Sequence, residues 1–222
     1  MTPAVTAERA QTINTYRLDW SEARGAKLAK IIRKVDASVV LVQECTPPMR
    51  DYLCRETGLV EAHGAGNLAA LIKPKVWAVE HDNDVVLTTG ADNRRALAVV
   101  LKHRATGCEV EFVNTHLTNL DGGGLAGEGW RLGQIAEVLR SFSGIDVLAG
   151  DFNSRKAVYA ALAAANLLDL RLRVEVENED AGHGWIDNLL TRQSLPVLAA
   201  GVVDTGDATD HPTMWAEIGV DQ

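Results

Sequence analysis

One pattern occurs twice in the chain and constrains its fold more than any other feature: a helix, a buried strand and then a carboxylate. Residues 21–44 and 129–151 both follow it, and they end at the carboxylates Glu44 and Asp151. The helical parts repeat apolar residues every 3.6 positions, and the strands are apolar on both faces, as in strands that are covered from both sides. The repeat predicts two sheets packed face to face with helices outside, which is a four-layer α-β-β-α sandwich.

In the rest of the chain, apolar and polar residues alternate as they do in strands joined by short turns. Residues 67–117 are typical of an antiparallel meander, so we expect two mixed, mostly antiparallel sheets. No Pro- or Ser-rich linker divides the halves, which predicts a single domain over residues 1–222 with its core at about 11–218. We expect strands at 11–16, 39–44, 67–72, 76–80, 85–88, 95–102, 109–117, 145–149, 185–191, 197–203 and 212–218, and helices at 21–36, 47–56, 129–141 and 155–166.

Charge and cysteine content exclude several classes of protein. The chain has 22 Lys and Arg against 30 Asp and Glu, a formal charge of −8, whereas a protein that coats nucleic acid through its phosphates is usually basic. No apolar run approaches the roughly 18 residues of a membrane span, and the first residues do not resemble a signal peptide. Three cysteines without a Cys-x-x-Cys pair indicate free thiols in a reducing compartment. We therefore expect a cytoplasmic monomer without a membrane span.

Several polar residues stand where apolar strands end. Glu44, His116 and Asp151 each come last on a strand face that otherwise points into the core, since side chains alternate along a strand. Asp187 and the pair Asp210-His211 stand in similar places near the C-terminus. A carboxylate or imidazole there is costly unless it is paired or bound to a cation. Each residue taken singly could cap a turn or pair with a neighbour, but the whole set predicts convergence on one pocket.

The residue types indicate a particular chemistry. Glu44, Asp151 and Asp210 offer hard oxygen ligands, which suit Mg²⁺ or Mn²⁺ and do not suit zinc. Such an ion can polarise a phosphoryl oxygen and activate a water molecule. His116 and His211 can donate hydrogen bonds to charge that develops on the phosphorus oxygens. The set therefore favours hydrolysis of a phosphate ester.

Six short motifs occur in the order found in one large superfamily. On them the chain resembles the endonuclease/exonuclease/phosphatase superfamily, with its DNase I-like fold and its exonuclease III-type members, over residues 11–218. The motifs are Thr12-Ile13-Asn14, Val42-Gln43-Glu44, Asn114-Thr115-His116-Leu117, Gly150-Asp151-Phe152-Asn153, Ile186-Asp187-Asn188-Leu189-Leu190 and Thr209-Asp210-His211-Pro212.

The resemblance implies a set of metal-site residues. Glu44 resembles the principal metal ligand, and Asn14 the asparagine that supports the metal and a nearby water. Asp151 resembles the carboxylate that orients or deprotonates the attacking water, and Asp210 an additional metal-site carboxylate.

The resemblance also implies a set of catalytic and phosphate-binding residues. His116 resembles the histidine that faces the phosphate, and Asn153 a contact of the scissile phosphate. Asp187 resembles the aspartate that hydrogen-bonds the final histidine, here His211. Arg95 resembles a phosphate-contacting arginine, with a solvated charge at a strand edge as the alternative interpretation.

Three functions remain open at this point. The first is a Mg²⁺- or Mn²⁺-dependent nuclease that hydrolyses the phosphodiester bonds of DNA. The second is a phosphatase or phosphodiesterase for a small or lipid-derived phosphate ester, which the acidic charge favours. The third is a binding module without catalysis, which the intact polar set disfavours. The interval from Glu44 to His116 is short for the superfamily, so the loops that grip duplex DNA in larger members should be trimmed.

Overall fold

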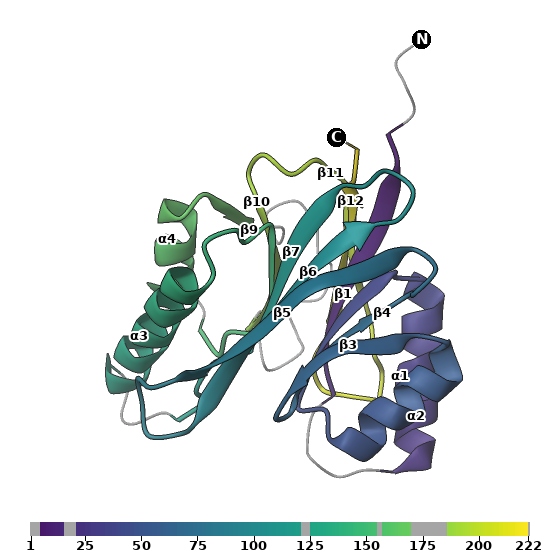
Figure 1. The fold of residues 1–222 in the computed structure, drawn as a ribbon. Helices are drawn as coiled ribbons and strands as arrows, with labels where there is room; N and C mark the ends of the chain where they lie inside the picture. Colours follow the sequence, from purple (N-terminus) through teal and green to yellow (C-terminus); the bar gives the residue numbers. More distant parts are fainter. Residues whose placement is uncertain (1–4, 16–20, 121–124, 155–156, 170–185, 222) are drawn as a thin grey trace.

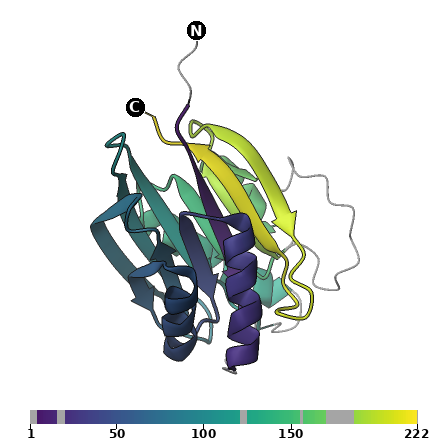
Figure 2. The same ribbon diagram turned by 90° about the vertical axis from the view of Figure 1, so that its right-hand side faces the viewer.

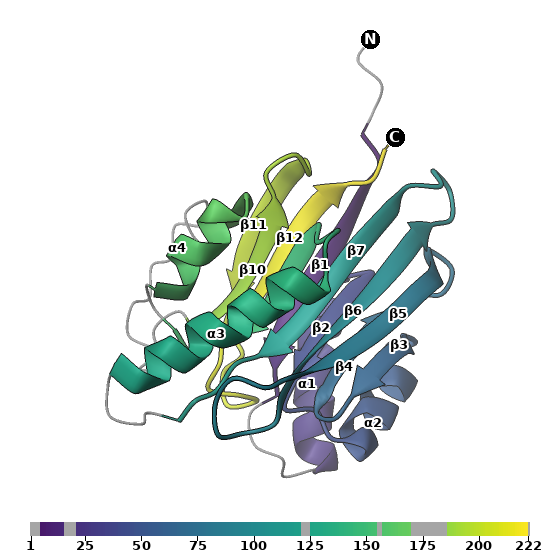
Figure 3. The same ribbon diagram turned by 60° about the vertical axis from the view of Figure 1, so that its left-hand side comes forward.

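The computed structural model describes residues 5–15, 21–120, 125–154, 157–169 and 186–221. These residues form two mixed six-stranded sheets that face each other, with helices on both outer faces (Figures 1 and 3). The predicted four-layer sandwich is therefore confirmed. In the described part of the chain, no helix is long and apolar enough to cross a membrane.

The first sheet carries helices α1 and α2 on its outer face, where the two helices lie side by side (Figure 2). Its strand order is β11 (Val197–Val203), β12 (Thr213–Gly219), β1 (Ala7–Asn14), β2 (Val39–Gln43), β4 (Leu68–Ile72) and β3 (Val60–Ala65), and its helices are α1 (Glu22–Val35) and α2 (Pro47–Thr57).

The second sheet carries α3 and α4 on its own outer face (Figure 3). Its strand order is β5 (Trp77–Leu87), β6 (Arg94–His103), β7 (Glu109–His116), β8 (Val147–Asp151), β10 (Asp187–Arg192) and β9 (Leu167–Asp169), and its helices are α3 (Leu125–Ser141) and α4 (Ala157–Ala164).

Each sheet contains one parallel pair, β1 with β2 and β7 with β8. Within each pair, a helix connects the first strand to the second, α1 in the first sheet and α3 in the second, because parallel neighbours need a crossover connection. Ser21 caps the start of α1 by accepting the N–H of Arg24, and Asp36 ends the helix in the left-handed region at φ 57°. The two crossovers bring the C-terminal ends of four central strands to one edge of the sandwich.

The core between the sheets is apolar for most of its length and becomes polar at that edge. Alternate residues of β1, β2, β7 and β8 face this layer, since side chains change sides along a strand. Its apolar part includes Ala10, Leu41, Phe112 and Ala149. Further along the same faces come the polar residues Thr12, Asn14, Gln43, Asn114, His116 and Asp151, which are all buried. The strands thus carry polar groups into a desolvated space at one end of the molecule.

Several element boundaries differ from the sequence-based expectation. Strand β3 was not expected, since its sequence Val60–Ala65 contains two charged or ionisable residues and a glycine. The expected strands 76–80 and 85–88 form one strand, β5, which continues through polar residues because it is an exposed sheet edge with a register shift between Val79 and His81. Helix α3 begins at Leu125, four residues before the expected start at residue 129.

Candidate active site

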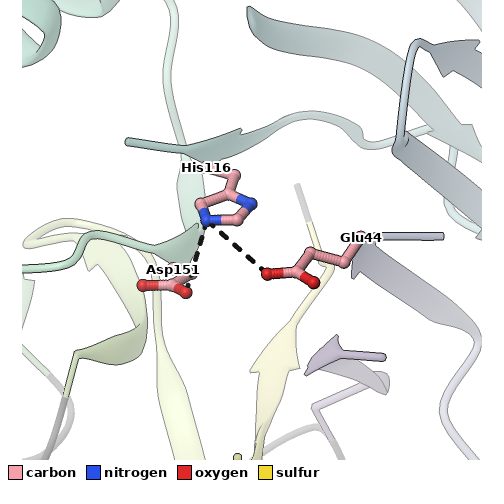
Figure 4. Close-up of side chains that lie close together, drawn as sticks. All are labelled: Glu44, His116 and Asp151. Atoms are coloured by element: carbon pink, nitrogen blue, oxygen red, sulfur yellow. Dashed lines mark ion pairs between the residues drawn. The ribbon is translucent and has the colours of Figure 1, made fainter. Parts of the chain in front are cut away.

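Two carboxylates and an imidazole meet at the polar edge, as Figure 4 shows. His116 Nε2 lies 3.5 Å from Asp151 Oδ2 and 4.0 Å from Glu44 Oε1. One ligand atom from each of the three residues falls within 4.8 Å of the others. The same holds for Asp151, Asp187 and His211, so Asp151 joins two overlapping clusters.

Glu44 reaches this cluster through an unusual backbone conformation. Alternation along an extended strand would place it on the face of Val40 and Val42, which pack among the α1 and α2 side chains. That part of the sequence-based argument is wrong: β2 ends at Gln43, and Glu44 has φ 53°. The turn is fixed because Thr15 Oγ1 donates to Glu44 O at 3.0 Å. The side chain therefore points to His116 and keeps about a quarter of its surface exposed.

Asp151 is buried and held from both sides. Asn14 Nδ2 donates to its Oδ2 at 3.0 Å, and the backbone N–H of Asn153 donates to its Oδ1 at 2.9 Å. Burial, and next the charge of Asp187, raises the pKa of Asp151 to about 7. Such a carboxyl can take up and release a proton near neutral pH.

Gly150 allows Asp151 to sit beside His116. The two residues are in register across the parallel β7–β8 pair. Gly150 has φ 148°, and a Cβ there would lie 1.9 Å from Thr115 O. Only glycine permits this approach of the two backbones, so the Gly-Asp step of the motif has a steric cause.

Asp187 and His211 form a second buried pair. Asp187 is in register with Asp151 across β8 and β10, and its Oδ2 lies 2.5 Å from His211 Nδ1. Burial lowers the pKa of His211, but the hydrogen bond and charge of Asp187 outweigh it and raise the pKa to about 9. His211 is therefore cationic at neutral pH and donates to Asp187 through Nδ1. Asp210 Oδ1 lies 3.7 Å from His211 Nε2, on the other ring nitrogen.

His116 has the opposite electrostatic state. It is buried, and desolvation lowers its pKa well below the ordinary value, with further lowering by Arg94 and His211. A neutral imidazole and a cationic one thus flank the same carboxylate, Asp151. Environments that push pKa values apart in this way are typical of catalytic sites.

A pocket of about 460 Å³ opens beside Glu44 and His116. Its other lining residues are Ala65, Gly66, Asn67, Leu68, Asp92, Asn93, Arg94, Arg95 and Asn119. Arg95 pairs with Asp84. Arg94 pairs with Asp92 and donates to Asn119 Oδ1 at 3.0 Å.

Sequence reasoning selected Arg95 for this region and missed Arg94. Both arginines line the pocket, and both are cationic. Asn153 lies at φ 47°, and its Nδ2 donates to Leu117 O at 2.9 Å, so one part of its side chain holds the backbone next to the site.

Three motif residues that sequence reasoning left without a role tie the two sheets together beneath the site. Gln43 Nε2 donates to Asn114 Oδ1 at 2.7 Å and to Thr12 Oγ1 at 3.1 Å. Asn114 Nδ2 donates to the carbonyls of Val42 and Ala69 at 2.9 and 3.0 Å. Thr12 and Asn114 stand two positions before Asn14 and His116, and this spacing was a signal that they share the same faces; Gln43 directly precedes Glu44.

The donor set suits a hard divalent cation. Glu44 and Asp151 supply carboxylate oxygens, and no cysteine belongs to either cluster among the described residues. Asp187 Oδ1 is buried and has no hydrogen-bond partner in the described part of the chain, a cost that a nearby cation would offset. Of the predicted metal residues, Glu44 and Asp151 lie together, Asn14 reaches the site through Asp151, and Asp210 lies against His211.

Fold and site together define a sandwich of two mixed sheets with a carboxylate–histidine centre at the ends of its central strands. The model of the endonuclease/exonuclease/phosphatase family matches residues 12–211, and the chain belongs to this family. It is a hydrolase that acts on phosphoester bonds.

Solved structures share the fold at low sequence identity. A family protein from Bacteroides thetaiotaomicron has a TM-score of 0.82 at 17% identity, covering 99% of this chain and 100% of that one. D. rerio TDP2, complexed with a single strand DNA product, has a TM-score of 0.78 at 15% identity over 96% and 99%. The mannosyl-6-phosphatase Bt3783 from Bacteroides thetaiotaomicron has a TM-score of 0.79 at 16% identity over 95% and 99%. No curated protein matches the chain significantly.

Proposed function

We propose that the chain is a Mg²⁺- or Mn²⁺-dependent phosphodiesterase that acts as a compact nuclease on DNA. The observation that carries the catalytic part is the meeting of Glu44, Asp151 and the Asp187–His211 pair within two overlapping clusters. Asp187 raises the pKa of His211 to about 9, so this imidazole carries at neutral pH the proton that it donates in the proposed mechanism.

Glu44 and Asp151 would hold the cation, with Asn14 and Asp210 in support. When bound, the cation supplies charge that polarises a phosphoryl oxygen and lowers the pKa of a water molecule. Asp151 orients the attacking water and accepts its proton. Asn14 keeps the Asp151 carboxylate in place through the 3.0 Å hydrogen bond.

His211 donates a hydrogen bond to the charge that develops on the phosphoryl oxygens. Asp187 holds the imidazole in its cationic form and fixes its orientation. His116 faces the same phosphate, and Asn153 and Arg95 are proposed as further phosphate contacts. The Arg95 guanidinium has five N–H donors, and the Asp84 pair uses only Nη1.

Two observations support DNA as the substrate. The pocket beside Glu44 and His116 is large enough for a group of nucleotide size, and its volume lies at the lower end of the range for ligand sites. TDP2, whose structure holds a single strand DNA product, has the same fold over nearly its whole length. Among the described residues, Arg94 and Arg95 are the cations that line the pocket. The formal charge of −8 and this short cationic lining favour an enzyme that contacts few phosphates beyond the scissile one.

A small phosphate ester is the second candidate substrate. Three asparagines, Asn67, Asn93 and Asn119, line the pocket together with Asp92, and amide groups of this kind can bind the hydroxyls of a small polar molecule. The fold of the mannosyl-6-phosphatase is compatible with this choice. We also propose one catalytic domain over residues 1–222 that acts as a monomer in the cytoplasm.

A substrate panel tests the proposal. Plasmid, single-stranded DNA, abasic duplex, RNA, inositol phosphates and bis-p-nitrophenyl phosphate are each incubated with Mg²⁺, Mn²⁺ or EDTA. We expect metal-dependent cleavage of DNA, and no turnover above background by the Asp151→Asn variant, which serves as the control for contaminating nucleases. Efficient turnover of an inositol phosphate without cleavage of any polynucleotide would overturn the DNA assignment in favour of the second candidate.

A further inference from the structure

Two segments of chain line the side of the pocket that the second sheet forms, and α3 packs against both. The first wall, residues 88–95, runs from the end of β5 into β6 and carries Asp92 to Arg95. The second wall, residues 116–120, runs on from the last residue of β7 and carries His116 and Asn119. The spacing of these neighbouring walls sets where the arginines lie relative to His116.

The backbone ladder between β6 and β7 does not extend to these walls. Its register runs from Lys102 opposite Glu109 to Ala96 opposite Thr115 and ends there. Beyond that point the side chain of Gln134, which is fully buried, lies between the segments. Gln134 Oε1 accepts the N–H of Thr118 at 2.9 Å, and Gln134 Nε2 donates to Thr89 O at 2.8 Å. The Gln134 amide therefore links the two segments beyond the end of the ladder, in addition to the bond from Arg94 Nη2 to Asn119 Oδ1 at 3.0 Å.

The packing of α3 brings the Gln134 amide close to both walls. A Cβ on Gly133 would lie 2.4 Å from Thr89 Cγ2, so a larger residue there would push the helix away from the first wall. Glu137 accepts the N–H groups of Thr88 and Thr89 at 2.6 and 3.0 Å. Arg131 Nη1 donates to Thr118 O at 3.3 Å on the second wall. Gln134 is the residue that binds both walls at once.

We propose that Gln134 is a positioning residue that fixes the spacing of the two walls and thereby selects the group attached to the reacting phosphate. The proposal rests on the proposed phosphodiesterase function. Gln134 does not line the pocket; it acts through Thr89 on the arginine wall and through Thr118 on the histidine wall. Losing either bond leaves the Arg94–Asn119 bond to hold the two walls together, so their spacing is less well fixed, and a pocket-filling substrate loses contacts while a small one does not.

Two esters with the same leaving group separate an effect on substrate selection from an effect on the rate of hydrolysis. The p-nitrophenyl ester of thymidine 5′-monophosphate places a nucleoside next to the phosphate, and bis-p-nitrophenyl phosphate does not. We expect the wild type to prefer the nucleotidyl ester in kcat/KM. Gln134→Met removes both hydrogen bonds and should cut this preference by about tenfold through KM. Gln134→Glu keeps the acceptor for Thr118 but loses the donor to Thr89, and should cut it by less.

A second measurement reports directly on the hydrogen bond between Gln134 and the second wall. Amide exchange at Thr118 should be faster in Gln134→Met and stay slow in Gln134→Glu, because only the former lacks the acceptor. Gln193→Met, the same change at an exposed position, is the control and should alter neither measurement. An unchanged preference in both Gln134 variants, or no preference in the wild type, overturns the proposal. Hydrolysis of neither ester by the wild type with Mg²⁺ or Mn²⁺ overturns the proposed function itself.

Discussion

Replacing Asp187 with asparagine should change how the rate depends on pH and not only the rate itself. The pKa of His211 is about 9 in the folded protein, against about 6.5 for an ordinary histidine. Without the Asp187 charge, burial still lowers the pKa of His211 while Asp151 and Asp210 still raise it, so we expect a value close to the ordinary 6.5. At pH 7.5 the cationic fraction then falls from roughly 97% to about 10%.

The loss of activity should follow the loss of cationic His211. Asp187→Asn should lose about tenfold or more in kcat/KM at pH 7.5 and much less at pH 6, where most of His211 is still cationic. The assay is hydrolysis of bis-p-nitrophenyl phosphate at saturating Mg²⁺ from pH 5.5 to 10. We expect the alkaline limb of the profile to move from about 9 towards about 6.5.

Controls for this prediction come from the same chain. Asp207→Asn removes an exposed carboxylate that pairs with Lys27, and its profile should match the wild type. Asp187→Ala, His211→Ala and the double variant should lose similar amounts of kcat, because residues that act as a unit are not additive. An equal loss at every pH with the alkaline limb unmoved would refute the role assigned to Asp187.

Three further predictions concern stability and substrate binding. Burial raises the pKa of Asp151, so the charged carboxylate destabilises the metal-free fold as pH rises from about 4 to about 7. In urea unfolding with EDTA, Asp151→Asn should be more stable than the wild type at pH 8 but not at pH 4. A difference in stability that is independent of pH would contradict this prediction. Gly150→Ala forces a Cβ against Thr115 O and should cost more than about 2 kcal/mol of unfolding free energy, a value that thermal or urea melts can disprove. Since the chain carries a formal charge of −8, the slope of log Kd for DNA against log salt should be about 2 to 4 between roughly 50 and 200 mM, and a slope near 6 would indicate an extended cationic groove.

Much of the fold was predictable from the sequence because apolar period and strand alternation are local properties. The positions of His116 and Asp151 followed from alternation along β7 and β8, and the structure has both on the face between the sheets. Glu44 was selected by the same argument, but its position depends on a left-handed turn after β2 that no alternation rule contains. The structure brings Glu44 to His116 and Asp151 as expected, but through this turn and not through strand alternation.

What the sequence could not supply are contacts made across the sandwich or from a helix to a loop. Strand β3 is polar enough to resemble a loop, and its pairing with β4 exists only after the sheet forms. The role of Gln134 depends on Thr89 and Thr118, which lie 45 and 16 positions away. Arg94 was overlooked because Arg95 next to it matched the family pattern, whereas the pocket contains both.

Metal binding at Glu44 tests the central claim most directly. Glu44→Gln removes one negative charge with little change of shape, so the fold should survive while affinity for Mn²⁺ and turnover fall together. Calorimetric titration with Mn²⁺ and hydrolysis of bis-p-nitrophenyl phosphate over the same metal range measure both. The account predicts that the wild type loses activity in EDTA and regains it with Mg²⁺ or Mn²⁺, whereas Glu44→Gln binds Mn²⁺ weakly and stays inactive at low metal. Full activity of Glu44→Gln at low Mg²⁺, or wild-type turnover that persists in EDTA, would contradict it.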